Sequence, residues 1–211
     1  KLFYAAQGGW VETTLGKVAS RVVGRTPARK EPSFWTDDMT YPFLTIADMG
    51  NRWVTAGREG VTAEAIERGQ ARRVPAGSLL LSFKLSIGKI CITDRDVYPN
   101  EAIAWVRPGP EVSQDFLSLA LEQVDWDELG QRAVKGKTMN RASLDSVPLL
   151  IPPIEEQQRI VDLIGTFDET VVKSWAPLAD LRDLRSTLLT ALLSGEHVIP
   201  ESYDDLLEAT A

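Results

Sequence analysis

The sequence predicts an α+β fold: a globular body with a curved, mostly antiparallel sheet, followed by a long C-terminal helical arm. Over the first 150 residues, short apolar runs alternate with glycine- and proline-rich turns, which is typical of strands joined by turns. From Ile151 onward the apolar residues instead recur at helical spacing. A chain of 211 residues is long enough for one medium domain and an appendage. We therefore expect a body at residues 1–150, a long helix at 151–195 and a tail at 196–211.

The elements of the body follow from its turn and capping residues. Thr62 is a good N-cap residue and Gly69 a good stop, which predicts a brief helix between them. Turns at residues 75–77 and 87–89 interrupt apolar runs, so strands are expected beside each turn. By the same signals we expect a short opening helix or turn at residues 10–16, strands at 19–23, 41–47, 102–107 and 148–151, and helices at 114–121 and 125–129.

The segment that opens the arm, IPPIEEQQRI at residues 151–160, has the features of a helix start. Two prolines end the preceding strand, and two glutamates follow in the first turn, where the helix dipole favours negative charge. The helix is expected over about 41 residues, roughly 60 Å, which is too long for the body to cover. Pro177 costs about 3 kcal/mol inside a helix, so we expect a bend or two helices that meet near residues 173–174.

An apolar stripe along this helix predicts that it packs against another protein surface. Its members recur in steps of 3 and 4 residues, as in a coiled coil. They are Ile160, Ile164, Phe167, Val171, Leu178, Leu181, Leu188 and Leu192. We expect a homodimer, in which the stripe packs against that of a second copy related by a twofold axis. The alternative is a helix that folds back on its own body.

Charge is divided unevenly along the chain. The net charge is −7, but residues 1–150 hold 19 Lys and Arg against 18 Asp and Glu, whereas residues 151–211 hold 4 against 12. Within the body, basic residues lie in two stretches without acids, at 13–30 and 129–144. Such clusters fit the neutralisation of nucleic-acid phosphates, and the alternative is two solvated loops.

The sequence offers little for catalysis. His197 is the single histidine and lies far along the chain from Cys91, the single cysteine, so no metal-ligand spacing occurs. There is no glycine-rich phosphate loop, and none of the 30 acidic residues has Lys two positions later, which argues against a metal-dependent nuclease. We predict no catalytic residues, no metal site and a buried strand position for Cys91. One cysteine and no run of membrane-spanning length favour a cytoplasmic protein without a membrane partner.

The order of several motifs resembles a known family. The pieces are WVETTLGKVAS, then GRTPAR, then VPAGSLLLSFKLSIGKICIT, then VKGKTMNRASLDSVPLLIPPIEEQQRIVDLI, and finally LRDLRSTLLTALLSGEHVIPESYD. In this order and spacing, and over nearly its whole length, the chain resembles half of a type I restriction-modification specificity subunit, the HsdS family. It departs from the family by having one recognition domain and one helix. It therefore resembles a half-length subunit or the C-terminal half of a longer chain, and its last motif resembles a natural subunit end.

The resemblance implies a role for each part. Residues 1–150 would form a target recognition domain that reads one half of a bipartite site in double-stranded DNA, and residues 151–195 the helix that spaces two such domains. The implied protein partners are a methyltransferase (modification) subunit, which carries S-adenosylmethionine, and a restriction subunit, which uses ATP and Mg²⁺. No cofactor is then expected on this chain itself. Two copies would imitate a full subunit and favour a palindromic bipartite site.

Residues for DNA contact are proposed from composition, because recognition domains of this family diverge with their targets. Cations in the first loop, near the turn at 86–88 and before the last strand fit contacts with phosphate or guanine, and nearby polar side chains add hydrogen bonds. The candidates are Arg21, Arg25, Thr26, Arg29, Lys30, Lys84, Lys89, Lys135, Lys137, Thr138, Asn140 and Arg141. Trp35 and Trp53 are further candidates for stacking on bases, with core packing as the expected role of each.

Two other functions are compatible with the sequence. One is an interaction or inhibitor module that joins a restriction complex without reading DNA. The other is a standalone nuclease, which the missing acid-x-Lys pattern disfavours.

Overall fold

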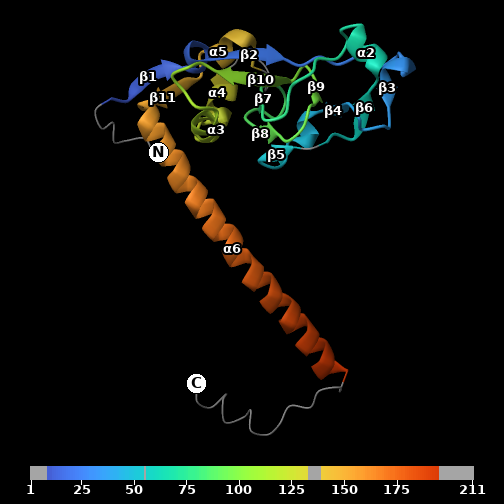
Figure 1. Ribbon diagram of the computed structural model, residues 1–211, viewed down its shortest axis with the longest axis vertical. Helices are drawn as coiled ribbons and strands as arrows, with labels where there is room; N and C mark the ends of the chain where they lie inside the picture. The colour runs from blue at the N-terminus through green and yellow to red at the C-terminus, as the bar shows by residue number, and fades with distance from the viewer. Residues whose placement is uncertain (1–8, 55, 133–138, 195–211) are drawn as a thin grey trace. The chain divides into compact units, whose positions relative to one another are not determined.

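The computed structural model describes residues 9–54, 56–132 and 139–194 (Figure 1). The chain divides into two compact units, residues 1–161 and residues 162–211. The first unit, called the body below, holds all the described strands and the start of the last helix. The second holds the rest of that helix.

The strands of the body form three sheets. Their orders are β1-β11, β2-β10-β7-β8-β5 and β3-β6-β4-β9. Among the described residues all pairings are antiparallel except β4 with β9 and β5 with β8, so the predicted α+β class and mostly antiparallel pairing are confirmed, although one curved sheet was expected. The strands are β1 (Val11–Thr14), β2 (Ala19–Val23), β3 (Trp35–Thr36), β4 (Pro42–Leu44), β5 (Trp53–Val54), β6 (Glu59–Val61), β7 (Leu79–Ser82), β8 (Ile90–Thr93), β9 (Tyr98–Pro99), β10 (Ile103–Pro108) and β11 (Pro148–Ile151).

Short helices connect these strands, and their starts are fixed by capping side chains. Thr62, Ser113 and Asn140 each accept a hydrogen bond from a backbone N–H three residues later, which satisfies a donor that the first helical turn leaves unpaired. The helices are α1 (Leu15–Val18), η1 (Pro32–Phe34), η2 (Ile46–Asp48), α2 (Ala63–Glu67), α3 (Gln114–Glu122), α4 (Trp126–Arg132), α5 (Arg141–Asp145) and α6 (Ile154–Leu193), where η denotes a 3₁₀ helix.

Two predicted elements differ from the structure. Residues 11–14 form strand β1 and not an opening helix or turn, because their partner β11 lies at the other end of the body sequence and pairs Val11 with Ile151. The strand expected at 41–47 stops at Leu44, where Thr45 and Asp48 form a reciprocal capping box that starts η2. In Figure 1, β1 and β11 lie at one end of the body and β3 and β6 at the other.

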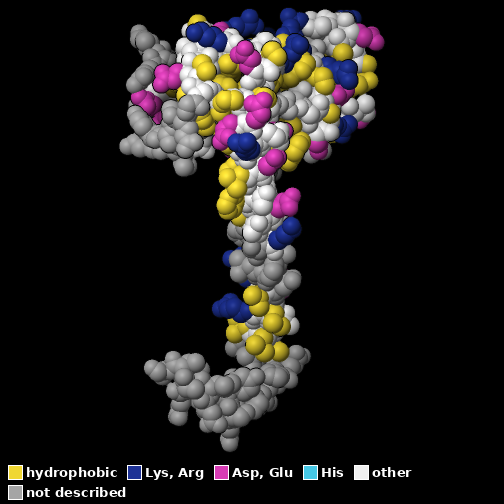
Figure 2. All heavy atoms as spheres, turned by 60° about the vertical axis from the view of Figure 1, so that its left-hand side comes forward, with side chains coloured by type: hydrophobic (Ala, Val, Ile, Leu, Met, Phe, Trp, Pro, Cys, Tyr) yellow, Lys and Arg dark blue, Asp and Glu magenta, His cyan; other side chains and the backbone are white. Residues whose placement is uncertain are grey.

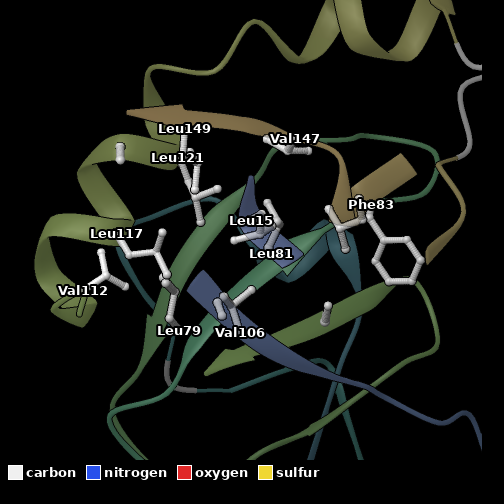
Figure 3. Packing of buried hydrophobic residues seen from close by; sticks show 14 of the residues in the cluster. Leu15, Leu79, Leu81, Phe83, Val106, Val112, Leu117, Leu121, Val147 and Leu149 are labelled. Atoms are coloured by element: carbon white, nitrogen blue, oxygen red, sulfur yellow. The ribbon is translucent and has the colours of Figure 1, made fainter. Parts of the chain in front are cut away.

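The core of the body lies on both faces of the five-stranded sheet. On one face, Leu79 and Leu81 of β7 and Val106 of β10 pack with Leu117 and Leu121 of α3 (Figure 3). Because successive side chains of a strand point to opposite faces, Leu80, Cys91 and Ile103 enter a second cluster on the other face. Burial on both faces explains why β7 is an uninterrupted apolar run.

The first turn of α6 is fixed to the body by one buried side chain. The amide oxygen of Gln157 accepts a hydrogen bond from the backbone N–H of Ser113 at 2.8 Å. Its amide nitrogen donates to the carbonyl oxygens of Glu111 and Pro152, each at 2.9 Å. The sequence IPPIEEQQRI thus starts a helix and also connects it to the loop before α3.

Helix α6 is continuous from Ile154 to Leu193, so the predicted division into two helices near Pro177 is wrong. Proline lacks one N–H and therefore removes one hydrogen bond, while the helical turns before and after it keep theirs. Each side is long enough to propagate a helix. Among the described residues, none of the helices combines the length and the apolar composition that a membrane span requires.

Candidate nucleic-acid interface

The first basic loop is joined to the connection between β9 and β10. The backbone N–H of Gly24 donates to the carbonyl oxygen of Ile103 at 3.0 Å, and that of Arg25 donates to Pro99 at 2.9 Å. A Cβ atom on Gly24 would lie 2.1 Å from the Pro99 oxygen, so glycine is required for this close approach. The loop at residues 24–30 is therefore held against residues 99–103.

The second and third basic segments meet the same connection. The N–H of Phe83, after β7, donates to Ala102 at 3.0 Å, and the N–H of Met139 donates to the carbonyl oxygen of Phe83 at 3.0 Å. Residues 24–30, 83–89 and 139–141 thus converge, although they lie far apart in the sequence. Together with residues 68–73, which contact the first loop as described below, they form a surface that we call the basic face.

The arginines at residues 68–73 were missed by the sequence analysis. The Arg25 side chain donates to the carbonyl oxygen of Gly69, and Arg72 donates to that of Val23 at 2.9 Å. Both contacts are with neutral carbonyls, so they position the two guanidinium groups without cancelling their charge. The run RGQARR, with three arginines in six residues and no acid, was the available signal. Its first member, Arg68, is the C-cap residue of α2, where the helix dipole favours a cation, and the other two follow the helix.

Arg29 is held in place by stacking and by an ion pair. Its guanidinium carbon lies 3.7 Å from the centre of the Trp35 ring, and its Nη1 atom lies 2.7 Å from a carboxylate oxygen of Glu59. Trp35 in turn packs edge-on against Phe43, with the ring centres 5.0 Å apart. The Arg29 side chain is 52% exposed, so its guanidinium group faces solvent although Trp35 and Glu59 hold it in place. Lys30, the next residue, is exposed.

Glu101 is an acid among these cations. The Thr26 hydroxyl donates a hydrogen bond to its carboxylate, and this bond is the largest of the causes that lower the pKa of Glu101. The positive charges of Lys84 and Arg29 lower it further. Glu101 therefore stays ionised and orders the Thr26 side chain beside the cations.

The hairpin between β7 and β8 carries two predicted lysines with different surroundings. The Lys89 ammonium donates to the carbonyl oxygen of Ile46 at 3.0 Å, so it is engaged with η2. Lys84 lies 5.6 Å from the centre of the Phe83 ring and is partly exposed. Between them Leu85 has a φ of +60° and is 73% exposed.

Arg21 is engaged in contacts within the body and is not available as a free cation. Its guanidinium forms a salt bridge with Asp145 and donates to the carbonyl oxygen of Arg141 at 3.2 Å. The Arg21 side chain is only 13% exposed. It connects β2 with α5, and we do not include it in the basic face. Asn140 caps α5 with its side chain, whereas Arg141 is exposed.

Several predicted residues lie elsewhere or outside the described part. Lys135, Lys137 and Thr138 lie outside the described residues, as does His197. Trp53 is 56% exposed on edge strand β5, so its expected core packing is wrong. Figure 2 shows several Lys and Arg side chains along one edge of the body, at the top of that view.

Cys91 lies in strand β8 and is 1% exposed, as predicted. Burial raises the pKa of its thiol to about 12, which keeps the sulfur protonated and unreactive. Among residues 9–54, 56–132 and 139–194, no group of three or more His, Cys, Asp or Glu side chains is placed to hold a metal ion.

The predicted stripe on α6 divides into a partly buried start and an exposed remainder. Ile160 packs against the main core cluster of the body. Further along, the exposed members are Ile164, Phe167, Val171, Leu181 and Leu188, with Leu163, Leu184 and Leu189 beside them. The side chains of Leu178 and Leu192 lie outside the described part of the structure.

Known proteins share both the sequence pattern and the fold. A family model described as type I restriction modification DNA specificity domain matches residues 7–173. The specificity subunit of the type I restriction enzyme HindI from Haemophilus influenzae is 25% identical over 197 residues, which are 89% of this chain and 42% of that protein. The chain spans less than half the length of the curated relatives that it matches.

Two solved structures have a similar fold. The HsdS subunit from Thermoanaerobacter tengcongensis superposes with a TM-score of 0.65 at 21% identity, covering 90% of this chain and 46% of that one. A chain from a structure on complex assembly of the type I R-M system gives a TM-score of 0.72 at 21% identity, covering 92% and 47%.

Proposed function

Because this chain belongs to the family of type I restriction modification DNA specificity domains, we propose that it reads one half of a bipartite site in double-stranded DNA. The observation that carries the proposal is the convergence of three separate basic segments, at 24–30, 83–89 and 139–141, through hydrogen bonds to residues 99–103 and between Met139 and Phe83. Loops held by a rigid scaffold are where binding residues are usually found. The body, residues 1–161, would serve as the recognition domain.

The chemistry of the basic face supports DNA as the ligand. Arg25 and Arg72 are oriented by backbone carbonyls and keep their charge, while Arg68, Lys30 and Arg141 are exposed. Exposed cations suit phosphate oxygens, and Arg68 keeps this exposure although it also pairs with Glu64 of α2 at 2.9 Å. An ordered guanidinium such as that of Arg29 suits the two acceptors of guanine.

We assign the chemical steps to partner subunits. A methyltransferase subunit would bind S-adenosylmethionine, and a restriction subunit would use ATP and Mg²⁺. This chain, which we expect in the cytoplasm, would bring these subunits to the DNA site without catalysing a reaction itself. The buried, protonated Cys91 supports this assignment, because a protonated thiol is a poor nucleophile.

The exposed stripe of α6 is proposed to pack against the same helix of a second copy. Ile164, Phe167 and Val171 are exposed at helical spacing, and burial of such side chains stabilises an interface by roughly 25 cal/mol per Å². A homodimer would then present two recognition domains to two half-sites in inverted orientation.

Selection from a random duplex library tests the DNA-reading role. The full chain, alone and with the methyltransferase subunit, is incubated with the library, and bound duplexes are sequenced. We expect one enriched sequence with inverted half-sites. Failure to enrich any sequence in either arrangement would overturn the proposal.

A variant that removes two positive charges tests the basic face itself. The double variant Arg68→Gln with Arg141→Gln should lose affinity for specific and non-specific duplexes alike. The slope of log K against log salt should become shallower by about 1 to 2. The matched control is Arg159→Gln with Lys173→Gln, two exposed cations of α6 that also form helical ion pairs, and it should bind as the wild type. Unchanged DNA binding and complex activity in the first variant would favour an interaction module instead.

A methylation assay tests the division of labour. The isolated chain should transfer no methyl group from S-adenosylmethionine to the enriched duplex, whereas the complex with the methyltransferase subunit should. Transfer by the isolated chain would contradict a non-catalytic role.

A further inference from the structure

Leu85 combines exposure with an unfavourable backbone conformation. It is 73% exposed at the tip of the β7–β8 hairpin, and its φ of +60° places it in the left-handed region. A branched side chain rarely adopts this conformation, which costs more for leucine than for glycine or asparagine. An exposed leucine gains nothing from burial here, so folding alone does not explain the residue.

The hairpin around Leu85 is rigid. The buried Ser82 hydroxyl donates to the carbonyl oxygen of Ser86 at 2.5 Å and accepts the N–H of Lys89 at 2.9 Å. The N–H of Gly88 donates to the Ser82 carbonyl at 2.9 Å, and a Cβ on Gly88 would lie 2.3 Å from the Trp126 ring. These contacts hold both ends of the loop. Strained residues that their surroundings hold in place are typical of binding sites.

The position of Leu85 points to nucleic acid. The preceding residue, Lys84, acts electrostatically on Glu101 of the basic face. One residue further back, Phe83 bonds to Ala102 and Met139, where the basic segments converge. On the other side of Leu85, Ile87 packs against the main core cluster, which leaves Leu85 as the outward apolar side chain of the loop. An exposed aliphatic side chain next to Lys84, in a loop that joins the basic face, suits the apolar surface of a DNA base.

We propose that Leu85 is a sequence-reading residue that packs against the apolar surface of a DNA base. This inference rests on the proposed function. The apolar surface is either the C5-methyl group of thymine in the major groove or the face of an unstacked base step, and apolar side chains make both kinds of contact in protein–DNA complexes. The rigid, strained backbone holds the side chain in position before DNA binds, which lowers the entropic cost of the contact.

Leu85→Asn and Leu85→Gly test the inference, because both residues tolerate a positive φ. The full chain with the methyltransferase subunit is used to select duplexes from a random library, with Val11→Thr as the control for an exposed apolar residue elsewhere on the body. Both variants should lose sequence preference at one or two adjacent positions and keep it at the others. Their affinity for the wild-type sequence should fall about tenfold, and their melting temperature should not fall.

The outcomes separate the two proposals. If the wild type enriches one sequence and both Leu85 variants enrich it equally, with equal affinity, the inference on Leu85 fails and the proposed function stands. If the wild type enriches nothing, both fail. If the loss of sequence preference is confined to one or two positions, thymine at those positions is replaced by deoxyuridine. A replacement that weakens DNA binding by the wild type alone identifies a contact with the methyl group. An increase in 2-aminopurine fluorescence at those positions with the wild type alone identifies unstacking.

Discussion

The side chain of Gln157 and the backbone of Ser113 are joined by a hydrogen bond of 2.8 Å that connects the first turn of α6 to the N-cap residue of α3. Gln157 is fully buried, and its other two hydrogen bonds go to carbonyl oxygens of Glu111 and Pro152. The start of the long helix therefore has a fixed position on the core of the body, which a flexible linker would not provide.

Gln157→Leu should destabilise the body strongly. The change leaves one N–H and two carbonyl groups without their partners, at one buried and two partly buried positions, so we expect a loss of ~2–4 kcal/mol in the free energy of unfolding. Urea titration followed by tryptophan fluorescence measures it. The exposed neighbour provides the control, since Gln158→Leu should change stability by less than about 0.5 kcal/mol. Equal losses in the two variants would contradict the structural role of Gln157.

Arg21→Ala should reduce stability without changing DNA sequence preference. Its partner Asp145 is partly exposed, so solvent screening limits the expected loss to about 1–2 kcal/mol. Lys17→Ala, at an exposed cation in the helix that precedes β2, should leave stability unchanged. Thermal unfolding and library selection on the same proteins give both readouts. An altered DNA preference in folded Arg21→Ala would return Arg21 to the DNA-contact set.

Thr26→Val should raise the pKa of Glu101. The Thr26 hydroxyl is the largest cause of the low pKa of this carboxyl group, and valine cannot donate a hydrogen bond. A depressed carboxyl pKa stabilises the fold at pH values above the unfolded pKa, and this stabilisation is lost as the pH falls through the folded pKa. The variant should therefore show a smaller stability loss between neutral and acidic pH. Side-chain ¹³C NMR titration of Glu101 checks the shift, and an unchanged midpoint would refute the assigned cause.

Phe167→Glu should convert a dimer to a monomer. Phe167 is 60% exposed in the first half of the α6 stripe, and a buried carboxylate there would oppose association. Light scattering at several protein concentrations measures the mass. Thr166→Glu adds the same charge one residue away, on the side of the helix roughly opposite to the stripe, and should leave the mass unchanged. A wild-type chain that stays monomeric at every concentration would exclude the homodimer.

Local sequence signals were sufficient to predict many of the helices and strands. A helix lies between the N-cap residue Thr62 and the stop residue Gly69, as predicted, and Gly69 has a φ of +66°. The prediction succeeded because caps and turns depend on neighbouring residues. The same holds for β2 and β11, whose bounds match the expected ranges. Strand β1 was missed because its hydrogen-bond partner lies at the far end of the body, which no local pattern encodes.

The candidate site was predicted only in part. Composition identified Arg25, Arg29 and Lys84 as cations in loops, but it did not separate them from Arg21, whose charge is paired with Asp145. The pairing depends on β2 and α5 meeting across 120 residues of sequence. Arg72 was overlooked for the same reason, since its place beside the first loop is set by a bond to Val23.

By itself the sequence determined the α+β class, the family and the division of charge between body and arm, because periodicity, motif order and composition are properties of the chain. Only the tertiary structure decided which cations share one surface and that Leu85 is exposed at a strained tip. Those features depend on contacts between residues distant in sequence, and the free energy of such contacts overrides local preferences.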